Sequence, residues 1–186
     1  MKRMAALAVL AGAVALMAVA GVAFAADIEC ERGGLGGVPC VGTDGPDRLF
    51  GSNVYNSMQG LGDDDLLYGR GGPDLMIGDS AGQSASATDG NDRLYGNLGR
   101  DDLYGGGGSD LLKGGDESDY IDAAEVPLNS SLGTEDEVIG GGGADRIVAR
   151  DFNFDAVDCG AGFDSVTYDA GLDEISANCE RQIAED

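Results

Sequence analysis

The sequence has no histidine and no tryptophan, and basic residues are scarce. Lys and Arg number 11 against 34 Asp and Glu, which gives a formal net charge of −23 at pH 7. Without histidine, most nucleophile–base triads and most zinc sites are excluded. The negative charge makes nucleic acid and anionic membranes poor electrostatic partners. We therefore expect neither a triad hydrolase nor a nucleic-acid-binding protein.

The N-terminal segment is the one long apolar stretch. Residues 1–25 start with Lys2 and Arg3, continue with apolar residues and end in small ones. This pattern is typical of a secretory signal peptide cleaved after Ala25, so we expect a secreted, extracellular protein with no membrane association afterwards. The alternative is an uncleaved signal anchor, because the apolar stretch approaches the length of a membrane span.

Only four cysteines are present, and they allow three pairings. Their positions favour two local bonds, Cys30 with Cys40 and Cys159 with Cys179. These bonds would close the two ends of the chain, where a repeat protein otherwise exposes an unpaired edge. A redox or zinc role for the first pair lacks support, because its spacing matches neither kind of motif.

Glycine and aspartate, by contrast, are abundant and recur with a nine-residue period. The segments are "GTDGPDRLF" from Gly42, "GRGGPDLMI" from Gly69, "GGGGSDLLK" from Gly105 and "GGGGADRIV" from Gly140. An apolar residue follows two positions after each aspartate, from Leu49 onwards. The period runs from residue 42 to 176, with one-residue register shifts. Residues 78–86 and 123–130 are degenerate, and we interpret them as rows with a swollen or unbound turn.

Each nine-residue unit has parts with distinct roles. Glycines at the first, second and fourth places allow positive φ and a sharp turn, and the aspartate at the sixth place adds a carboxylate. The last three residues fit a brief strand with the eighth side chain inward. If two units form one coil and coils stack, aspartates eighteen residues apart lie above one another. The predicted stacks are Asp47 over Asp65, Asp101 over Asp119, Asp74 over Asp92 over Asp110, and Asp145 near Asp164.

Stacked carboxylates at the roughly 5 Å spacing of strands repel one another unless a cation lies between them. A set of donors made of oxygen atoms alone favours a hard cation, and flexible carboxylates and carbonyls favour Ca²⁺ over Mg²⁺. The repeat therefore predicts calcium sites in its turns.

The nonapeptide GGxGxDxUx resembles the haemolysin-type calcium-binding repeat of RTX proteins. "GGGGSDLLK" and "GGGGADRIV" match it at every specified place. The resemblance implies an all-β fold, a right-handed parallel β-roll of about seven coils with two rows per coil and Ca²⁺ between adjacent coils. Carried over row by row, it makes metal ligands of Asp47, Asp65, Asp74, Asp92, Asp101, Asp110, Asp119, Asp136, Asp145 and Asp164.

Departures from the repeat predict weak or empty sites. Asn56 and Gln83 occupy aspartate places, and Asp63 and Glu117 occupy glycine places. Relatives in this family commonly leave the cell through an uncleaved C-terminal signal, whereas this chain has an N-terminal leader. We expect four segments: the signal peptide (1–25), a disulfide-bonded cap (26–41), the repeat domain (42–176) and a tail tied by a disulfide (177–186).

The function predicted is that of a secreted, monomeric calcium-binding protein that folds on binding about four to six ions. We expect no catalytic activity, because the repeat accounts for the aspartates and no cleft-forming domain is evident. The alternative is a Ca²⁺-dependent adhesion or glycan- or protein-interaction module with a cell-wall or surface partner. A carbohydrate-stacking stripe at Tyr68, Tyr95 and Tyr104 would serve it. The residues at the ninth place are too mixed for an ice-binding ladder.

Overall fold

The computed structural model describes residues 27–30, 39–79, 89–124 and 134–185. The predicted leader (1–25) lies outside the described residues, as do Gln83 and Ala85 of the repeat pattern. In the described ranges the regular structure is β-strand throughout. No helix in these ranges has the length and hydropathy of a membrane span.

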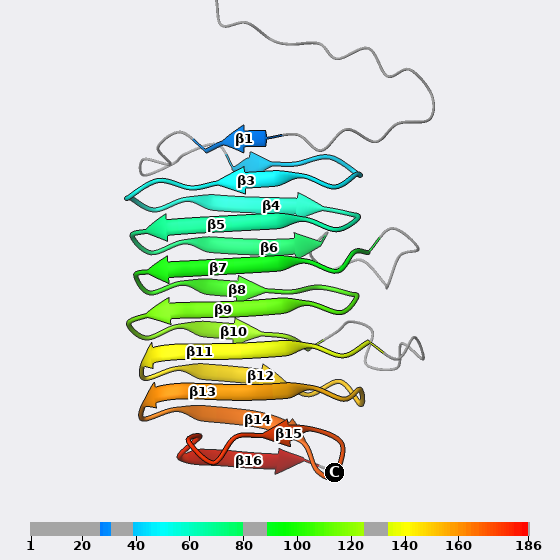
Figure 1. Cartoon of the computed structure of the whole chain (residues 1–186), viewed down its shortest axis with the longest axis vertical. Helices are drawn as coiled ribbons and strands as arrows, with labels where there is room; N and C mark the ends of the chain where they lie inside the picture. The colour runs from blue at the N-terminus through cyan, green and yellow to red at the C-terminus, as the bar shows by residue number, and fades with distance from the viewer. Residues whose placement is uncertain (1–26, 31–38, 80–88, 125–133, 186) are drawn as a thin grey trace, which may run out of the picture.

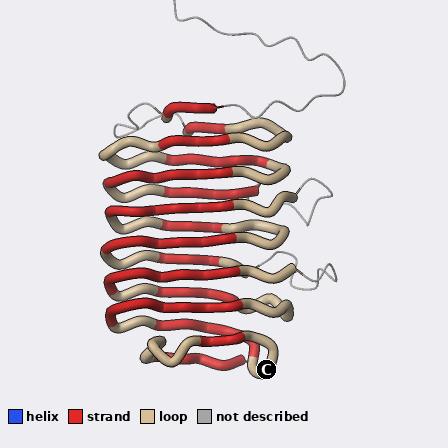
Figure 2. Tube along the Cα trace, viewed as in Figure 1, coloured by secondary structure: helices blue, strands red, loops and turns tan. Residues whose placement is uncertain are grey.

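The strands alternate between two parallel sheets along the chain (Figure 1). Sheet A consists of β1 (Asp27–Glu29), β3 (Arg48–Phe50), β5 (Leu66–Gly71), β7 (Arg93–Leu98), β9 (Leu111–Asp116), β11 (Glu137–Gly143), β13 (Ala156–Gly162) and β15 (Glu174–Ile175). Sheet B consists of β2 (Cys40–Val41), β4 (Ser57–Leu61), β6 (Leu75–Asp79), β8 (Asp102–Tyr104), β10 (Tyr120–Asp122), β12 (Arg146–Ala149), β14 (Ser165–Asp169) and β16 (Arg181–Glu185). Short turns join the sheets at both edges (Figure 2), so the predicted parallel β-roll is confirmed.

The core is a single layer of apolar side chains between the two sheets. Because side chains alternate along a strand, a three-residue strand sends only its middle residue inward. Sheet A contributes Leu49, Leu67, Leu94, Leu112, Val138 and Val157, and sheet B contributes Met58, Met76, Leu103, Ile121, Ile147 and Val166. All are at most 2% exposed, which confirms the prediction for the eighth place of the repeat.

The chain between β6 and β7 is longer than the other turns by one repeat. Leu66 of β5 pairs with Arg93 of β7, so sheet neighbours across this connection are twenty-seven residues apart. The described strands keep their alternation between the two sheets on both sides of it. The chain between β10 and β11 is also longer, because Leu111 of β9 pairs with Glu137 of β11. Both connections lead from sheet B to sheet A.

Both ends of the roll carry the predicted disulfides, Cys30–Cys40 and Cys159–Cys179. The strands extend beyond the repeat range of 42–176. β1 and β2 start the two sheets, and β16 pairs with β14 over five residues. The segment 177–186 therefore supplies the last strand of sheet B in addition to its disulfide.

Candidate metal-binding turns

The sixth-place residues form two ladders, one at each edge of the roll. The ladder in the turns from sheet B to sheet A contains Asp47, Asp65, Asp92, Asp110, Asp136, Asp155 and Asp173. The ladder in the turns from sheet A to sheet B contains Asn56, Asp74, Asp101, Asp119, Asp145 and Asp164. Within each ladder, the backbone N–H of one residue donates to Oδ1 of the next, at 2.6 to 3.1 Å.

These ladders confirm most of the predicted stacks and correct one. Asp47 with Asp65, Asp101 with Asp119, Asp145 with Asp164 and Asp92 with Asp110 are neighbours, as predicted. The predicted stack of Asp74 over Asp92 is wrong. Asp74 lies beside Asp101, and Asp92 lies beside Asp65. Partners across the chain between β6 and β7 are twenty-seven residues apart, nine more than the eighteen of Asp47 and Asp65.

Where glycine stands at the first place of a turn, it does so for a steric reason. A Cβ on Gly42 would lie 2.7 Å from Oδ2 of Asp47, and a Cβ on Gly140 would lie 2.7 Å from Oδ2 of Asp145. These glycines do not have positive φ, whereas second-place glycines such as Gly106 do. The prediction that all three glycine places serve positive φ is therefore wrong for the first place, where glycine leaves room for the carboxylate.

All the sixth-place aspartates predicted as ligands are buried, with exposed fractions of 0 to 4%. Oδ1 is occupied by the neighbouring amide. The second oxygen, Oδ2, has no hydrogen-bond partner within the described part of the chain in Asp65, Asp74, Asp92, Asp101, Asp110, Asp119, Asp145 and Asp164. A buried polar atom without a partner is costly, and a buried charge even more so. A proton or a bound cation would remove this cost at each Oδ2 atom.

Electrostatics favour the same conclusion. Burial raises the pKa of Asp74, Asp92 and Asp119 to about 8, although each accepts a backbone N–H that lowers it. Burial likewise raises the pKa of Asp65 to about 7. The pKa of Asp110 is raised well above its ordinary value, first by burial and then by the charges of neighbouring aspartates. Without a cation, a pKa of about 8 means that Asp74, Asp92 and Asp119 would be mostly protonated at pH 7 in the folded roll.

The donors available in these turns suit a hard cation that accepts backbone ligands. No cluster of three or more Asp, Glu, Cys or His side chains with metal-site spacing occurs in the described ranges. A cation here would therefore combine carboxylate oxygens with backbone carbonyl oxygens, as Ca²⁺ does in flexible oxygen cages. The orphaned Oδ2 atoms and the absence of nitrogen and sulfur donors fit Ca²⁺.

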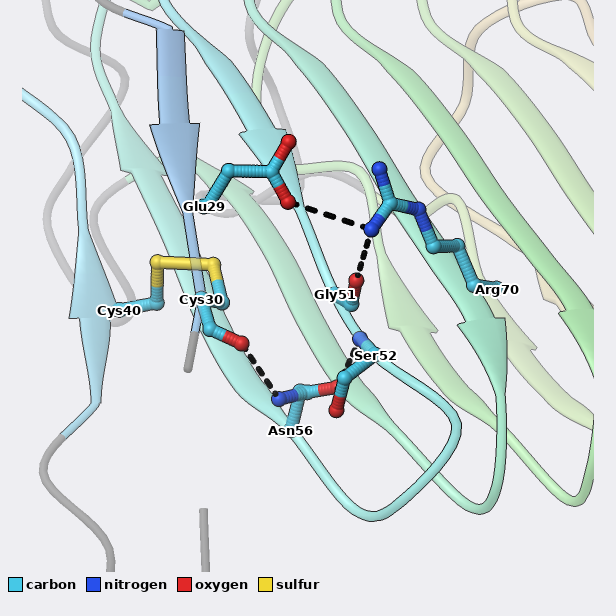
Figure 3. Close-up of polar contacts among 7 residues, drawn as sticks. All are labelled: Glu29, Cys30, Cys40, Gly51, Ser52, Asn56 and Arg70. Atoms are coloured by element: carbon cyan, nitrogen blue, oxygen red, sulfur yellow. Dashed lines mark hydrogen bonds and ion pairs between the residues drawn. A yellow bond between two sulfur atoms is a disulfide. The ribbon is translucent and has the colours of Figure 1, made fainter. Parts of the chain in front are cut away.

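The first two turns are built differently, because a hydroxyl residue stands at the second place. Thr43 donates to Oδ2 of Asp47 through its backbone N–H at 2.5 Å and its Oγ1 at 2.9 Å. Ser52 donates in the same way to Oδ1 of Asn56, and Nδ2 of Asn56 donates to the carbonyl of Cys30 (Figure 3). Protein donors thus satisfy these two side chains. The weak site at Asn56 stays a prediction.

Four buried aspartates were not predicted as ligands, Asp79, Asp151, Asp155 and Asp169, and neither was the partly buried Asp173. Asp155 and Asp173 continue the first ladder, and the nine-residue pattern that reaches them was the signal available in the sequence. Asp79, 3% exposed, accepts N–H groups from Gly90 at 3.4 Å and Gly107 at 3.0 Å. Its charge raises the pKa of Asp92. Asp79 stands at the second place of its row, where it pairs with Leu61 in the sheet, and the repeat pattern specifies glycine and not a carboxylate at this place.

A two-sheet parallel roll whose turns stack buried carboxylates is a metal-binding solenoid. A family model agrees: the RTX calcium-binding nonapeptide repeat matches residues 41–76, 77–112, 86–121 and 133–153. The chain belongs to the RTX calcium-binding nonapeptide-repeat family, and it is a calcium-binding repeat protein. Searches of curated proteins and of solved structures returned no match.

Proposed function

We propose that this protein is a secreted calcium-binding protein whose roll folds when calcium binds, and that it has no catalytic activity of its own. The observation that carries the proposal is the row of buried Oδ2 atoms that lack a hydrogen-bond donor. A folded chain with these oxygens ionised and uncompensated would be strongly destabilised. Calcium bound only by the folded chain would stabilise it by mass action.

The ligands proposed are the sixth-place aspartates named above from the sequence, except Asp47, whose Oδ2 accepts from Thr43. Asp155 and Asp173 are added because they continue the same ladder. Each carboxylate would supply an oxygen, and the glycine-rich turns would supply backbone carbonyl oxygens. The bound ion would neutralise the carboxylates of adjacent coils. We propose about four to six ions, because the first two turns satisfy their own side chains with Thr43 and Ser52.

The test is calcium counting by isothermal titration calorimetry on residues 26–186 at pH 8.5, where the buried carboxyl groups would be ionised, with far-UV circular dichroism recorded at each step. The expected result is uptake of several ions together with a gain of β-sheet signal. A chain that keeps its full β-sheet signal in excess chelator, and takes up no calcium afterwards, would overturn the proposal.

Secretion has a separate test. The leader, residues 1–25, is outside the described residues, and its sequence pattern supports export. The two disulfides support an oxidising compartment as the working environment. Mass spectrometry of the protein recovered from the producing cell and from its medium should find a chain in the medium that begins at Ala26. Retention of the intact leader in the membrane fraction would favour a signal anchor.

The alternative function, an adhesion or glycan- or protein-interaction module, is favoured by one observation. Phe50, Tyr68 and Tyr95 stack along sheet A, with ring centroids 5.7 and 4.9 Å apart. Pull-down on cell-wall material with and without calcium distinguishes a module from a free calcium-binding protein. A module binds such material only when calcium is present.

A further inference from the structure

The outer face of sheet A has an open groove of about 730 Å³. This volume is within the roughly 300 to 1,000 Å³ typical of small-molecule sites. Its lining includes Phe50, Tyr68, Arg70, Asn97, Gly115 and Asp116. Glycine at position 115 leaves the groove unfilled beside Asn97, its partner in the sheet. The groove thus combines an aromatic wall with a rim of planar polar groups.

The polar rim is held in a defined orientation. Arg70 Nη1 donates to the carbonyl of Gly51 at 2.9 Å and contacts Glu29 Oε2 at 3.2 Å (Figure 3). The guanidinium also lies 5.4 Å from the ring centroid of Phe50. Because both polar contacts use Nη1, the remaining guanidinium N–H groups are available to a ligand. Restraining a side chain before binding reduces the entropy cost of binding.

Arg70 and Asn97 share an unusual backbone conformation. They are paired in the sheet at the second place of their turns, and have φ of 76° and 75°. At Gly106 and Gly115 this place is glycine with positive φ, and Leu61 is a further non-glycine residue with φ of 102°. A non-glycine residue in this conformation is strained, and such strain is concentrated at functional sites. Two polar side chains thus lie side by side in the sheet, although a positive φ is unfavourable for residues other than glycine.

We propose that this groove binds a neutral oligosaccharide. Sugar rings present C–H faces that pack against aromatic side chains, and hydroxyl groups that both donate and accept hydrogen bonds. The guanidinium of Arg70 donates, the carboxylate of Asp116 accepts, and the carboxamide of Asn97 does both. The net charge of −23 disfavours anionic polymers. Three strands at about 4.8 Å spacing give a groove about 10 Å across, enough for a disaccharide.

Calcium dependence of this site rests on the proposed function. Arg70, Asn97 and Asp116 belong to the turns that end in Asp74, Asp101 and Asp119. The Oδ2 atoms of these three aspartates lack donors. If calcium folds these turns, it also assembles the polar rim. Sugar binding should then disappear when calcium is removed.

The experiment uses calorimetry on calcium-loaded residues 26–186 with cellohexaose, mannohexaose and the hexamer of N-acetylglucosamine. Galacturonate hexamer and hexalysine serve as acidic and basic probes. The informative variant is Arg70→Gly with Asn97→Gly, because glycine suits this backbone and restores the repeat pattern. The predicted stripe is divided between the two sheets, because Tyr104 lies in β8 of sheet B whereas Tyr68 and Tyr95 lie in sheet A. Tyr104→Ala, which is outside the groove, is therefore the matched control. Calcium uptake and far-UV circular dichroism are recorded for every variant.

The expected result is binding of at least one neutral hexamer, weakened at least about tenfold in the double variant and unchanged in Tyr104→Ala. Calcium uptake should stay at the wild-type level in both variants, which separates this proposal from the proposed function. The proposal is overturned if folded protein binds none of the neutral hexamers. It is also overturned if the double variant binds them like wild type, or if an acidic or basic probe binds more tightly.

Discussion

The first two turns of the roll and the central turns have the same fold but satisfy their buried acceptors differently. In the first two, Thr43 and Ser52 donate to the sixth-place side chain. In central turns such as those ending at Asp110 and Asp145, the second place is glycine and Oδ2 has no donor. We infer that the hydroxyl residue takes the place of an external cation in the first two turns. On the proposed function, the requirement for calcium then belongs to the central turns, whereas the first two turns form their own hydrogen bonds.

The largest expected effect concerns pH in the absence of metal. Burial raises the pKa of Asp74, Asp92 and Asp119 to about 8, against about 3.9 in an unfolded chain. The folded state therefore binds more protons, and this contribution to stability is complete below about pH 4. It is lost as the pH rises through the folded pKa of about 8. Far-UV circular dichroism in chelator should show a folded roll near pH 4 and an unfolded chain at pH 8.5.

Calcium should reverse this pH dependence, because the cation replaces the protons and binds better to ionised carboxylates. The calcium-loaded roll should be folded at pH 8.5 and lose its ions as the pH falls. Identical spectra in chelator at pH 4 and pH 8.5 would contradict the assignment of the buried oxygens.

The next effect concerns the ends of the roll. Cys159 occupies a first-place glycine position, and its side chain is bonded to Cys179 beyond the last full coil. Replacing both cysteines by alanine should lower the free energy of unfolding of the calcium-loaded protein by about 3 kcal/mol. Calorimetric calcium counts should not change, since the central turns stay intact. A loss of several ions in this variant would show that calcium binding in the central turns depends on the C-terminal end of the roll.

A smaller effect separates the central from the first turns directly. Asp110→Asn removes the charge that a cation would neutralise and should lower the unfolding free energy in calcium by about 1–3 kcal/mol. Asp47→Asn should change it by less than about 0.5 kcal/mol, because an amide oxygen accepts from Thr43 as Asn56 accepts from Ser52. Urea denaturation at fixed calcium gives both values. Equal losses in the two variants would remove the distinction between the regions.

The smallest effect is a gain. Converting the second turn to the central type, with Ser52→Gly and Asn56→Asp, should create one further calcium site. At tenfold excess over its dissociation constant, that ion adds about 1.4 kcal/mol of stability. Calorimetry should count one more ion than in wild type. An unchanged count would mean that a hydroxyl donor is not what keeps calcium out of this turn.

Much of the fold could be predicted from the sequence, because one short unit encodes it. A fixed period specifies both the inward residue, as at Leu67, and the carboxylate, as at Asp65. The two disulfides could also be predicted, since Cys30 and Cys179 flank the array. The nine-residue pattern could not predict which rows are neighbours on the two sides of the chain between β6 and β7. Counting in nines paired Asp74 with Asp92, whereas its neighbour in the structure is Asp101, twenty-seven residues further on.

The candidate site was predictable in its residue types but not in its hydrogen bonding. Nothing in the repeat pattern distinguishes the satisfied side chain of Asp47 from the orphaned oxygen of Asp92, because the difference depends on Thr43. Asp79 was missed because it stands at the second place, where the repeat specifies glycine, and its contacts with Gly90 and Gly107 appear only in the structure. The steric role of the first-place glycine likewise appears only when the carboxylate has a position in space.

The most direct test of the central claim is amide hydrogen exchange on residues 26–186 at pH 7.5, with calcium and then with chelator. The N–H groups of Asp92 and Asp101 donate to carboxylates of the adjacent coil and report on the central turns. We predict strong protection of both amides in calcium, loss of protection in chelator, and recovery when calcium is restored. Undiminished protection in chelator, with no metal bound, would contradict the account.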